Sequence, residues 1–314
     1  MTKIAFIFPG QGSQTVGMGK ELADIYPNVE KIFHKADEVL GEKLSDLIFD
    51  GPQHDLTLTT NAQPALLTVS TAILQAVTEQ SIFPDYVAGH SLGEYSALVA
   101  NNALNFEDAV QIVRKRGEYM ETALPHGQGT MAAILGMDRE ILKEITEQVS
   151  GSGDSVQLAN LNCPGQIVIS GTKAGVDKAC SIAKENGARR TIPLEVSGPF
   201  HSVLMEPARE RMKSVLANYD IRKTEIPVIS NVTAEPTTLG HEIKQLLIQQ
   251  ITSPVLWEDS VRKMIQLGVT TFVEIGPGKV LTGLIRKIDR TVKVLPIYDE
   301  STLNIAISEL KGEK

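Results

Sequence analysis

The stretch DYVAGHSLGEY, residues 85–95, sets a short apolar run against a glycine-bounded turn and the start of a helical pattern. Asp85–Gly89 predicts a buried strand, and Glu94–Asn101 predicts a helix. The turn between them, GHSLG at residues 89–93, has the G-x-S-x-G form of a nucleophile elbow, which exposes a serine hydroxyl at the carboxyl end of a sheet. The stretch therefore predicts an α/β fold with Ser91 as a candidate nucleophile; an ordinary glycine-rich turn is the alternative.

Short apolar runs and helical patterns alternate on both sides of this elbow. Strand-like runs are expected at residues 4–8, 226–230, 271–275 and 292–297. Helical patterns at residues 62–79, 105–122, 203–218, 239–251, 259–267, 280–287 and 302–310 separate them. Alternation of this kind predicts a parallel sheet covered by helices on both faces.

A different order interrupts the pattern after the glycine-rich link PHGQG at residues 125–129. The next elements read β-α-β-β-α-β, which is the order of a ferredoxin-like unit; their ranges are 131–135, 138–149, 156–161, 166–170, 174–186 and 189–194. We therefore expect a large α/β domain formed by residues 1–126 and 198–314. The small domain, residues 127–197, is expected to be inserted into it.

Composition excludes several classes of function. The 314 residues carry 30 basic and 38 acidic side chains, a net charge of −8, and only 5% aromatic residues, so a general nucleic-acid binder is not expected. The two cysteines and six histidines show no disulfide framework and no zinc-ligand spacing. No run reaches the roughly 18 apolar residues of a membrane span, and none has the form of a signal peptide. We expect a cytoplasmic protein without a metal.

A serine nucleophile needs a general base, and histidine is the usual one. His90 adjoins Ser91, and neighbours on a sharp turn point apart. His201 follows the loop VSGPF, residues 196–200, where the chain re-enters the large domain, and it ranks first as the base. A loop histidine without a catalytic role is the alternative. The other four lie in polar stretches, in the link or at a helix start: His34, His54, His126 and His241.

Two glycine-rich turns resemble nucleotide-binding loops only superficially. GQGSQT at residues 10–15 lacks the third glycine of a dinucleotide motif, and GPGK at residues 276–279 lacks the spacing of a P-loop. The first turn has another use. Its Gln11 N–H, together with the N–H of Leu92 after the nucleophile, would form the two halves of an oxyanion hole.

A basic run, RKRG at residues 114–117, lies on the helix that follows the elbow helix. Solvated surface charge is its ordinary interpretation. An arginine from this run that turned toward the elbow would bind a carboxylate through two parallel hydrogen bonds, which lysine cannot do.

Seven blocks of this sequence, taken in order, resemble the malonyl-CoA:acyl-carrier-protein transacylases, the acyltransferases of bacterial fatty-acid synthesis. One block alone would be weak, whereas seven in the family's order span the chain from about residue 4 to residue 297. The blocks are FPGQGSQ (8–14), GHSLGEYSA (89–97), Arg116-Gly117 with Met120, PFHS (199–202), SNVTA (230–234), Gln250 ahead of SPV (253–255), and EIGPG (274–278).

The resemblance implies a fold and an activity. The fold is an α/β-hydrolase-like large domain with an inserted ferredoxin-like small domain. The activity is transfer of a malonyl group from malonyl-CoA to the phosphopantetheine thiol of acyl carrier protein, through a malonyl-serine ester in ping-pong order. Malonyl-CoA is then the substrate and acyl carrier protein the partner, no bound cofactor is expected, and we expect a monomer.

The resemblance also implies six site residues, each at a position that matches a family motif. Ser91 is the acyl-accepting nucleophile, and His201 is its base and later its acid. The other four are the two backbone donors to the oxyanion, the cation for the malonyl carboxylate and the backbone carbonyl that orients the histidine: Gln11 and Leu92, Arg116, and Gln250. Phe200 resembles the malonyl-selective form of the motif, so malonyl is expected over methylmalonyl.

Three alternatives remain at this point: a serine esterase or thioesterase with the same Ser91 and His201, a discrete acyltransferase of a polyketide assembly line, and a non-catalytic docking protein. Docking of the carrier is expected to depend on basic residues near the cleft mouth, each also explicable as solvated charge; the candidates are Arg189, Arg190, Arg286 and Lys287.

Overall fold

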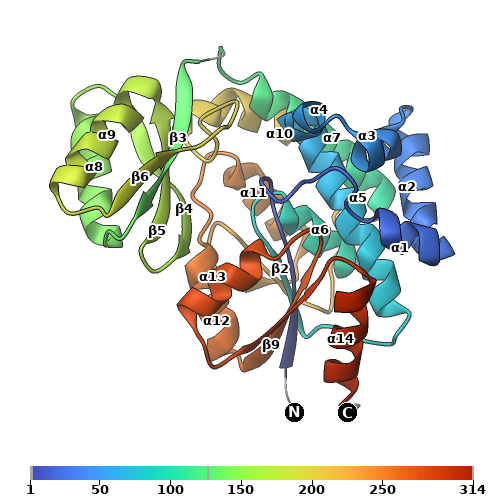
Figure 1. The fold of residues 1–314 in the computed structure, drawn as a ribbon. Helices are drawn as coiled ribbons and strands as arrows, with labels where there is room; N and C mark the ends of the chain where they lie inside the picture. The colour runs from blue at the N-terminus through green and yellow to red at the C-terminus, as the bar shows by residue number, and fades with distance from the viewer. Residues whose placement is uncertain (1–2, 126, 313–314) are drawn as a thin grey trace.

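The residues that the structure describes form two sheets, one in each of two packed units (Figure 1). The structure is a computed structural model and describes residues 3–125 and 127–312. Within these residues the larger sheet has the strand order β10-β9-β1-β2-β7-β8, and all neighbours pair in parallel except β7 and β8. The strands are β1 (Lys3–Phe8), β2 (Tyr86–Gly89), β7 (Val228–Ile229), β8 (Pro236–Thr237), β9 (Val269–Ile275) and β10 (Lys293–Ile297).

Helices cover both faces of the larger sheet, as the side chains of its central strand β1 require. Phe6 and Phe8 pack into one hydrophobic cluster with helices such as α5 and α7, whereas Ala5 and Ile7 pack into another with α12 and α13. The helices of this unit are α1 (Lys20–Ile25), α2 (Pro27–Leu40), α3 (Leu44–Asp50), α4 (Gln53–Thr57), α5 (Thr59–Thr78), α6 (Gly93–Ala100), α7 (Phe106–Glu121), α10 (Glu206–Leu216), α11 (Gly240–Gln250), α12 (Trp257–Gln266), α13 (Val280–Ile288) and α14 (Glu300–Lys311). The predicted parallel sheet with two helical layers is therefore confirmed.

The smaller unit, at the upper left of Figure 1, has an antiparallel sheet in the order β4-β5-β3-β6. Its helices and strands close a separate hydrophobic cluster around Leu142, Ile169 and Val176. The elements are β3 (Gly129–Leu135), α8 (Arg139–Gly151), β4 (Val156–Cys163), β5 (Gln166–Thr172), α9 (Lys173–Glu185) and β6 (Arg190–Pro193). The predicted β-α-β-β-α-β order is confirmed.

Two element predictions were too long. The strand expected at residues 226–230 is reduced to Val228–Ile229, because Pro227 lacks a backbone N–H for the ladder and the polar turn at Ser230 ends the strand. The helix expected at residues 203–218 begins as a short 3₁₀ turn, and its α-helical part starts at Glu206, where Pro207 fits the first helical turn.

A backbone seam joins the two units beside the cleft. Leu161 N–H of β4 donates to the carbonyl of Val255 over 2.9 Å, and Val255 N–H donates to the carbonyl of Ala159 over 2.8 Å. The seam places β4 against the loop that follows α11. The domain boundaries at residues 126/127 and 197/198 remain predictions, and residue 126, with His126, lies outside the described residues.

Candidate active site

The elbow is a tight turn between β2 and α6, and two glycines permit it. Ser91 has a φ of 51°, in the left-handed region that side-chain-bearing residues rarely adopt. A Cβ added at Gly89 would lie 2.0 Å from backbone atoms of Gly93, and one added at Gly93 would lie 2.1 Å from the carbonyl oxygen of Phe8. The elbow therefore presses against the end of β1, and Ser91 is held at the carboxyl edge of the sheet.

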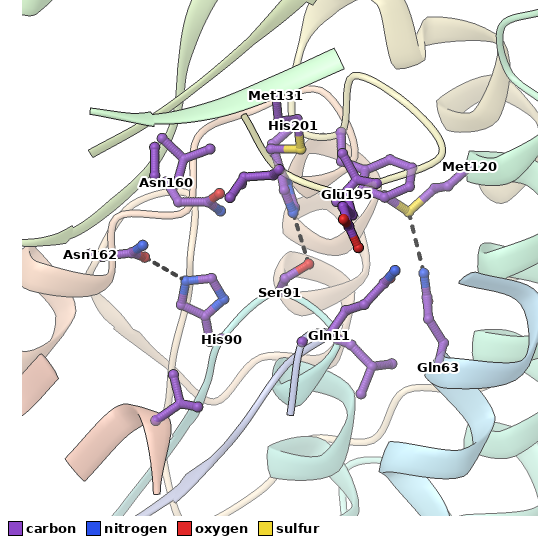
Figure 2. Close-up of a pocket in the computed structure, with 18 of the residues that line it drawn as sticks. Gln11, Gln63, His90, Ser91, Met120, Met131, Asn160, Asn162, Glu195 and His201 are labelled. Carbon is purple, nitrogen blue, oxygen red and sulfur yellow. Dashed lines mark hydrogen bonds between the residues drawn. The ribbon is translucent and has the colours of Figure 1, made fainter. Parts of the chain in front are cut away.

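Ser91 and His201 point toward one another across this edge (Figure 2). Ser91 Oγ lies 2.8 Å from His201 Nε2, and His201 Nδ1 lies 2.9 Å from the backbone carbonyl oxygen of Gln250. Since a carbonyl only accepts, Nδ1 carries the ring proton and Nε2 is left to accept the proton of the serine hydroxyl. The predicted nucleophile and base thus form a hydrogen-bonded pair oriented by a neutral acceptor.

His201 is buried, and burial lowers the pKa of its imidazole to about 3, with the positive charge of Arg116 as the second cause. The imidazole is therefore neutral at pH 7, which is the form that accepts a proton from Ser91.

Arg116 projects from α7 to the same point, although RKRG looks like a surface charge run. Its side chain is 1% exposed, and its Nη2 donates to Ser91 Oγ over 3.1 Å and to Gln250 Oε1 over 2.8 Å. Its Nη1 donates to Gln63 Oε1 over 2.8 Å, and its Nε has no partner within the described residues. No described carboxylate forms an ion pair with Arg116, so the site holds a buried cation whose hydrogen-bond partners are neutral oxygens.

The turn after β1 supplies the other side of the site. Gln11 and Leu92 both line the cavity beside Ser91, and in the part of the chain that the structure describes neither backbone N–H donates a hydrogen bond. The side chain of Gln11 is fixed by a bond from Nε2 to Thr59 Oγ1 over 3.1 Å. Two backbone donors are thus available near the nucleophile, which is the requirement of an oxyanion hole.

A buried polar network beneath the elbow was missed by sequence reasoning. Asn231 Oδ1 accepts a bond from the Ser91 backbone N–H over 2.7 Å, and Asn231 Nδ2 donates to the carbonyl of Gly89 over 2.7 Å. Glu94, 1% exposed, accepts a bond from Gln250 Nε2 over 2.7 Å, and burial raises its pKa to about 7. Both residues lie in blocks that resemble the transacylases, GHSLGEYSA and SNVTA. Asn231 comes just after β7, the strand that pairs with β2.

The cavity above Ser91 has a volume of about 420 Å³, within the range of small-molecule sites. Apolar side chains including Met120, Met131 and Phe200 line one part of it, and Asn160 and Asn162 of β4 line another. The cavity therefore lies between the two units. Its apolar wall suits an acyl chain, and its amide groups suit the polar part of a ligand.

The other histidines are not at the nucleophile. His90 turns away from Ser91, as expected, and its Nε2 lies 2.8 Å from Asn162 Oδ1 (Figure 2). His34 and His54 are exposed and lie beside acidic neighbours. Among the described residues no group of three or more His, Cys, Asp or Glu side chains is arranged to hold a metal ion. No helix in residues 3–125 or 127–312 has the length and hydropathy needed to cross a membrane.

The four basic residues suggested for docking are exposed, but none lines the cavity itself. Lys287 on α13 comes nearest, since its Nζ donates to Oε1 of the cavity residue Gln166 over 3.1 Å. Arg286 is its neighbour on α13, and Arg189 and Arg190 lie at the start of β6.

Comparison with known proteins agrees with this geometry. Residues 5–306 match the family model of the acyl transferase domain. A malonyl CoA-acyl carrier protein transacylase of Bacillus subtilis is 60% identical over 100% of this chain and 99% of its own length.

Solved structures agree as well. The crystal structure of the transacylase of the same name from Clostridium perfringens superimposes with a TM-score of 0.95, at 42% identity over 99% of this chain and 98% of that one. A malonyl-transacylase in complex with its type II PKS acyl-carrier protein gives a TM-score of 0.96, at 39% identity over 98% of this chain and 100% of that one. The chain belongs to the acyltransferase family of the malonyl CoA-acyl carrier protein transacylases.

Proposed function

We propose that this protein is an S-malonyltransferase that moves the malonyl group of malonyl-CoA to the phosphopantetheine thiol of acyl carrier protein. The observation that carries the proposal is the hydrogen-bonded pair of Ser91 and His201 beside the buried cation of Arg116 in one cavity. A serine–histidine pair performs acyl transfer, and an unpaired guanidinium selects an acyl group that ends in a carboxylate.

In the first half-reaction Ser91 Oγ attacks the thioester carbonyl carbon while His201 Nε2 takes the hydroxyl proton. The carbonyl oxygen becomes an oxyanion that the N–H groups of Gln11 and Leu92 stabilise. The carbon–sulfur bond then breaks, and His201 returns the proton to the departing sulfur, giving free coenzyme A and malonyl-Ser91. Arg116 holds the malonyl carboxylate throughout.

The second half-reaction reverses these steps with a different thiol. The carrier's phosphopantetheine sulfur attacks the ester carbonyl carbon while His201 takes its proton. The ester bond to Ser91 Oγ breaks, His201 returns the proton to that oxygen, and malonyl-carrier leaves. The backbone carbonyl of Gln250 keeps the proton of Nδ1 in place, so Nε2 alone exchanges protons in both halves.

Phe200 supports selection of malonyl over a branched extender. Its ring is 6% exposed and lines the cavity directly before His201, so it fills space that a substituent on the malonyl α-carbon would need. We propose malonyl rather than methylmalonyl as the acyl group.

A thioesterase is the competing function, because it uses the same nucleophile and base. Arg116 favours transfer, since a carboxylate-binding group beside the ester fixes the malonyl chain for a second thiol. Mixing the protein with malonyl-CoA and holo-carrier tests this: malonyl-carrier should form in amounts that match the coenzyme A released. Mostly free malonate would instead identify a hydrolase.

Fatty-acid synthesis is the proposed setting, and polyketide synthesis is the second candidate. The second is favoured by one observation, the match to a malonyl-transacylase that was solved with a type II PKS acyl-carrier protein. Transfer rates on a fatty-acid carrier and on a polyketide carrier, measured side by side, separate the two.

We further propose that the protein works as a cytoplasmic monomer with two domains. Residues 1–126 and 198–314 form the large domain, and residues 127–197 form the small one. No bound cofactor is proposed, because the steps above need only protein groups. The net charge of −8 supports the expectation that nucleic acid is not a partner.

The pH dependence of acylation should reflect the pKa of His201. The neutral imidazole is active, so activity is lost only as pH falls through about 3. We expect kcat/KM for malonyl-CoA to fall by less than about twofold between pH 7.5 and pH 5. A histidine at its ordinary pKa of about 6.5 would give a fall of about 30-fold over the same range. Rapid-mixing measurement of coenzyme A release across this range checks the expectation.

Glu94 is the matched control for that profile, because its raised pKa of about 7 lies inside the measured range. Glu94→Gln removes this titration and leaves His201 in place. An inflection near 6.5 that persists in Glu94→Gln would assign an ordinary pKa to His201 and contradict the expectation.

Carrier docking should depend on charge at the cleft mouth. Lys287→Glu and Arg286→Glu should each raise KM for the carrier by about fivefold at low salt, because both side chains are exposed and the family resemblance implies an acidic carrier. The difference should shrink as ionic strength rises, and KM for malonyl-CoA is the internal reference. Lys31→Glu on α2 is the control, since it makes the same charge change away from the cavity. Equal KM values for all three variants would exclude docking at α13.

A further inference from the structure

The side chain of Gln157, on β4 of the small unit, contacts the two loops that hold His201. Its Nε2 donates to the backbone carbonyl oxygens of His201 over 3.2 Å and of Thr252 over 3.4 Å. Its Oε1 accepts a bond from the backbone N–H of Val203 over 3.0 Å. The second loop follows Gln250, whose carbonyl orients the imidazole. One amide therefore joins the two segments whose spacing sets the position of the ring.

The backbone of His201 needs such support. Its φ is 57°, in the left-handed region that a residue with a side chain rarely occupies. A conformation of this kind persists only where surrounding contacts hold it. The carbonyl of His201 itself is one of the three groups that Gln157 bonds, so the support acts directly on the strained residue.

The strand that carries Gln157 is itself anchored to the second loop. The seam between Ala159, Leu161 and Val255 lies two to four residues beyond Gln157 on β4. The amide is thus presented from a paired strand and not from a mobile surface segment. Elements of this kind hold catalytic groups more accurately than loops do.

Gln157 does not touch the substrate cavity. It lines a separate hollow of about 630 Å³ that shares no lining residue with the cavity above Ser91. All three side-chain hydrogen bonds of Gln157 lead instead to His201 and the adjoining loops.

We infer that Gln157 is a positioning residue for acyl transfer, which holds the loop of His201 at a fixed distance from the loop of Gln250. The inference rests on the proposed function, in which His201 is the base. It explains why one unit of the protein contributes a side chain to the back of a site whose reacting groups all belong to the other.

The test is Gln157→Met, which keeps the length of the side chain and removes its three hydrogen bonds. We expect kcat for acylation to fall by about 10- to 100-fold, since small displacements of a reacting group cost rates of this size. KM for malonyl-CoA should stay within about twofold, because Gln157 makes no contact with the substrate cavity. Gln148→Met, at an exposed position of α8, is the matched control and should leave both values unchanged.

Two charged variants separate positioning from bulk folding. Gln157→Lys restores a donor to the two carbonyl groups and should recover part of kcat, whereas Gln157→Glu places a negative charge against them and should not. Equal kcat values for the Lys and Glu variants would overturn the inference, as would wild-type kcat in Gln157→Met. These two variants also decide the question if Gln157→Met does not fold.

His201→Ala keeps this test distinct from that of the proposed function. Loss of transfer in His201→Ala with wild-type kcat in Gln157→Met would overturn only the positioning role. Full transfer in His201→Ala would instead overturn the proposed base.

Discussion

Ser91→Ala should leave the protein unable to take up a malonyl group and should lower transfer by at least about 10⁴-fold. Removal of the nucleophile in serine enzymes has effects of this size or larger, because the covalent route is lost and only binding and the oxyanion hole remain. In this protein Ser91 is the hydroxyl that His201 Nε2 contacts, at 2.8 Å. Intact-mass measurement after brief exposure to malonyl-CoA should show one added malonyl group on the wild type and none on the variant.

Ser96→Ala is the matched control. Ser96 lies on α6, five residues beyond the nucleophile, and its buried Oγ has no hydrogen-bond partner within the described residues. Its removal should leave both the mass gain and the transfer rate unchanged. Rapid malonylation of Ser91→Ala at the wild-type rate would place the acyl group elsewhere and overturn the proposed mechanism.

The elbow and the sheet could be predicted because their signals are local. A glycine-bounded turn between an apolar run and a helical pattern specifies its own geometry, and the structure has Ser91 on such a turn. The alternation of Phe6 and Phe8 with Ala5 and Ile7 likewise follows from one strand covered on both faces. For these features the nearest neighbours in sequence carried enough information.

Contacts between segments that are distant in sequence are harder to predict. From spacing alone His201 was only the first-ranked histidine, because 110 residues and a whole inserted unit separate it from Ser91. The sequence indicates no role for Asn231, since its contact with the elbow depends on the pairing of β2 with the short strand β7. Gln157 gave no signal at all, because a polar residue on a strand reads as solvent-facing. Residues that act through tertiary contacts need the fold before they can be recognised.

Net charge does not report the charge at the site. A chain with a charge of −8 is not expected to favour anionic ligands, yet Arg116 is a buried cation without an acidic partner among the described residues. The field at the nucleophile depends on groups at short range, Arg116 and the buried Glu94, whereas distant surface carboxylates are screened by solvent and salt. Binding of an anion is therefore decided by a group that total charge does not report.

Arg116→Ala should remove most of the preference of the protein for malonyl over acetyl. The wild type should disfavour acetyl-CoA strongly, because an acetyl group leaves the buried guanidinium without a counter-charge. Sites built around a buried polar contact reject substrates that lack it by about 10⁴- to 10⁵-fold. Removal of Arg116 abolishes both the penalty against acetyl and the favourable binding of the malonyl carboxylate. We expect the ratio of kcat/KM for malonyl-CoA to that for acetyl-CoA to fall by at least about 10³-fold.

Acylation by acetyl-CoA is the internal check on folding, since a variant that still acylates Ser91 has an intact elbow and base. Lys115→Ala, an exposed neighbour on α7, removes one positive charge without touching the site and should keep the wild-type ratio. Arg116→Lys should give a ratio between those of the wild type and Arg116→Ala, because an ammonium keeps the charge and loses the paired hydrogen bonds. An unchanged ratio in Arg116→Ala would remove Arg116 from carboxylate binding. Selectivity would then have to come from the apolar wall at Phe200, which distinguishes acyl groups by size and not by charge.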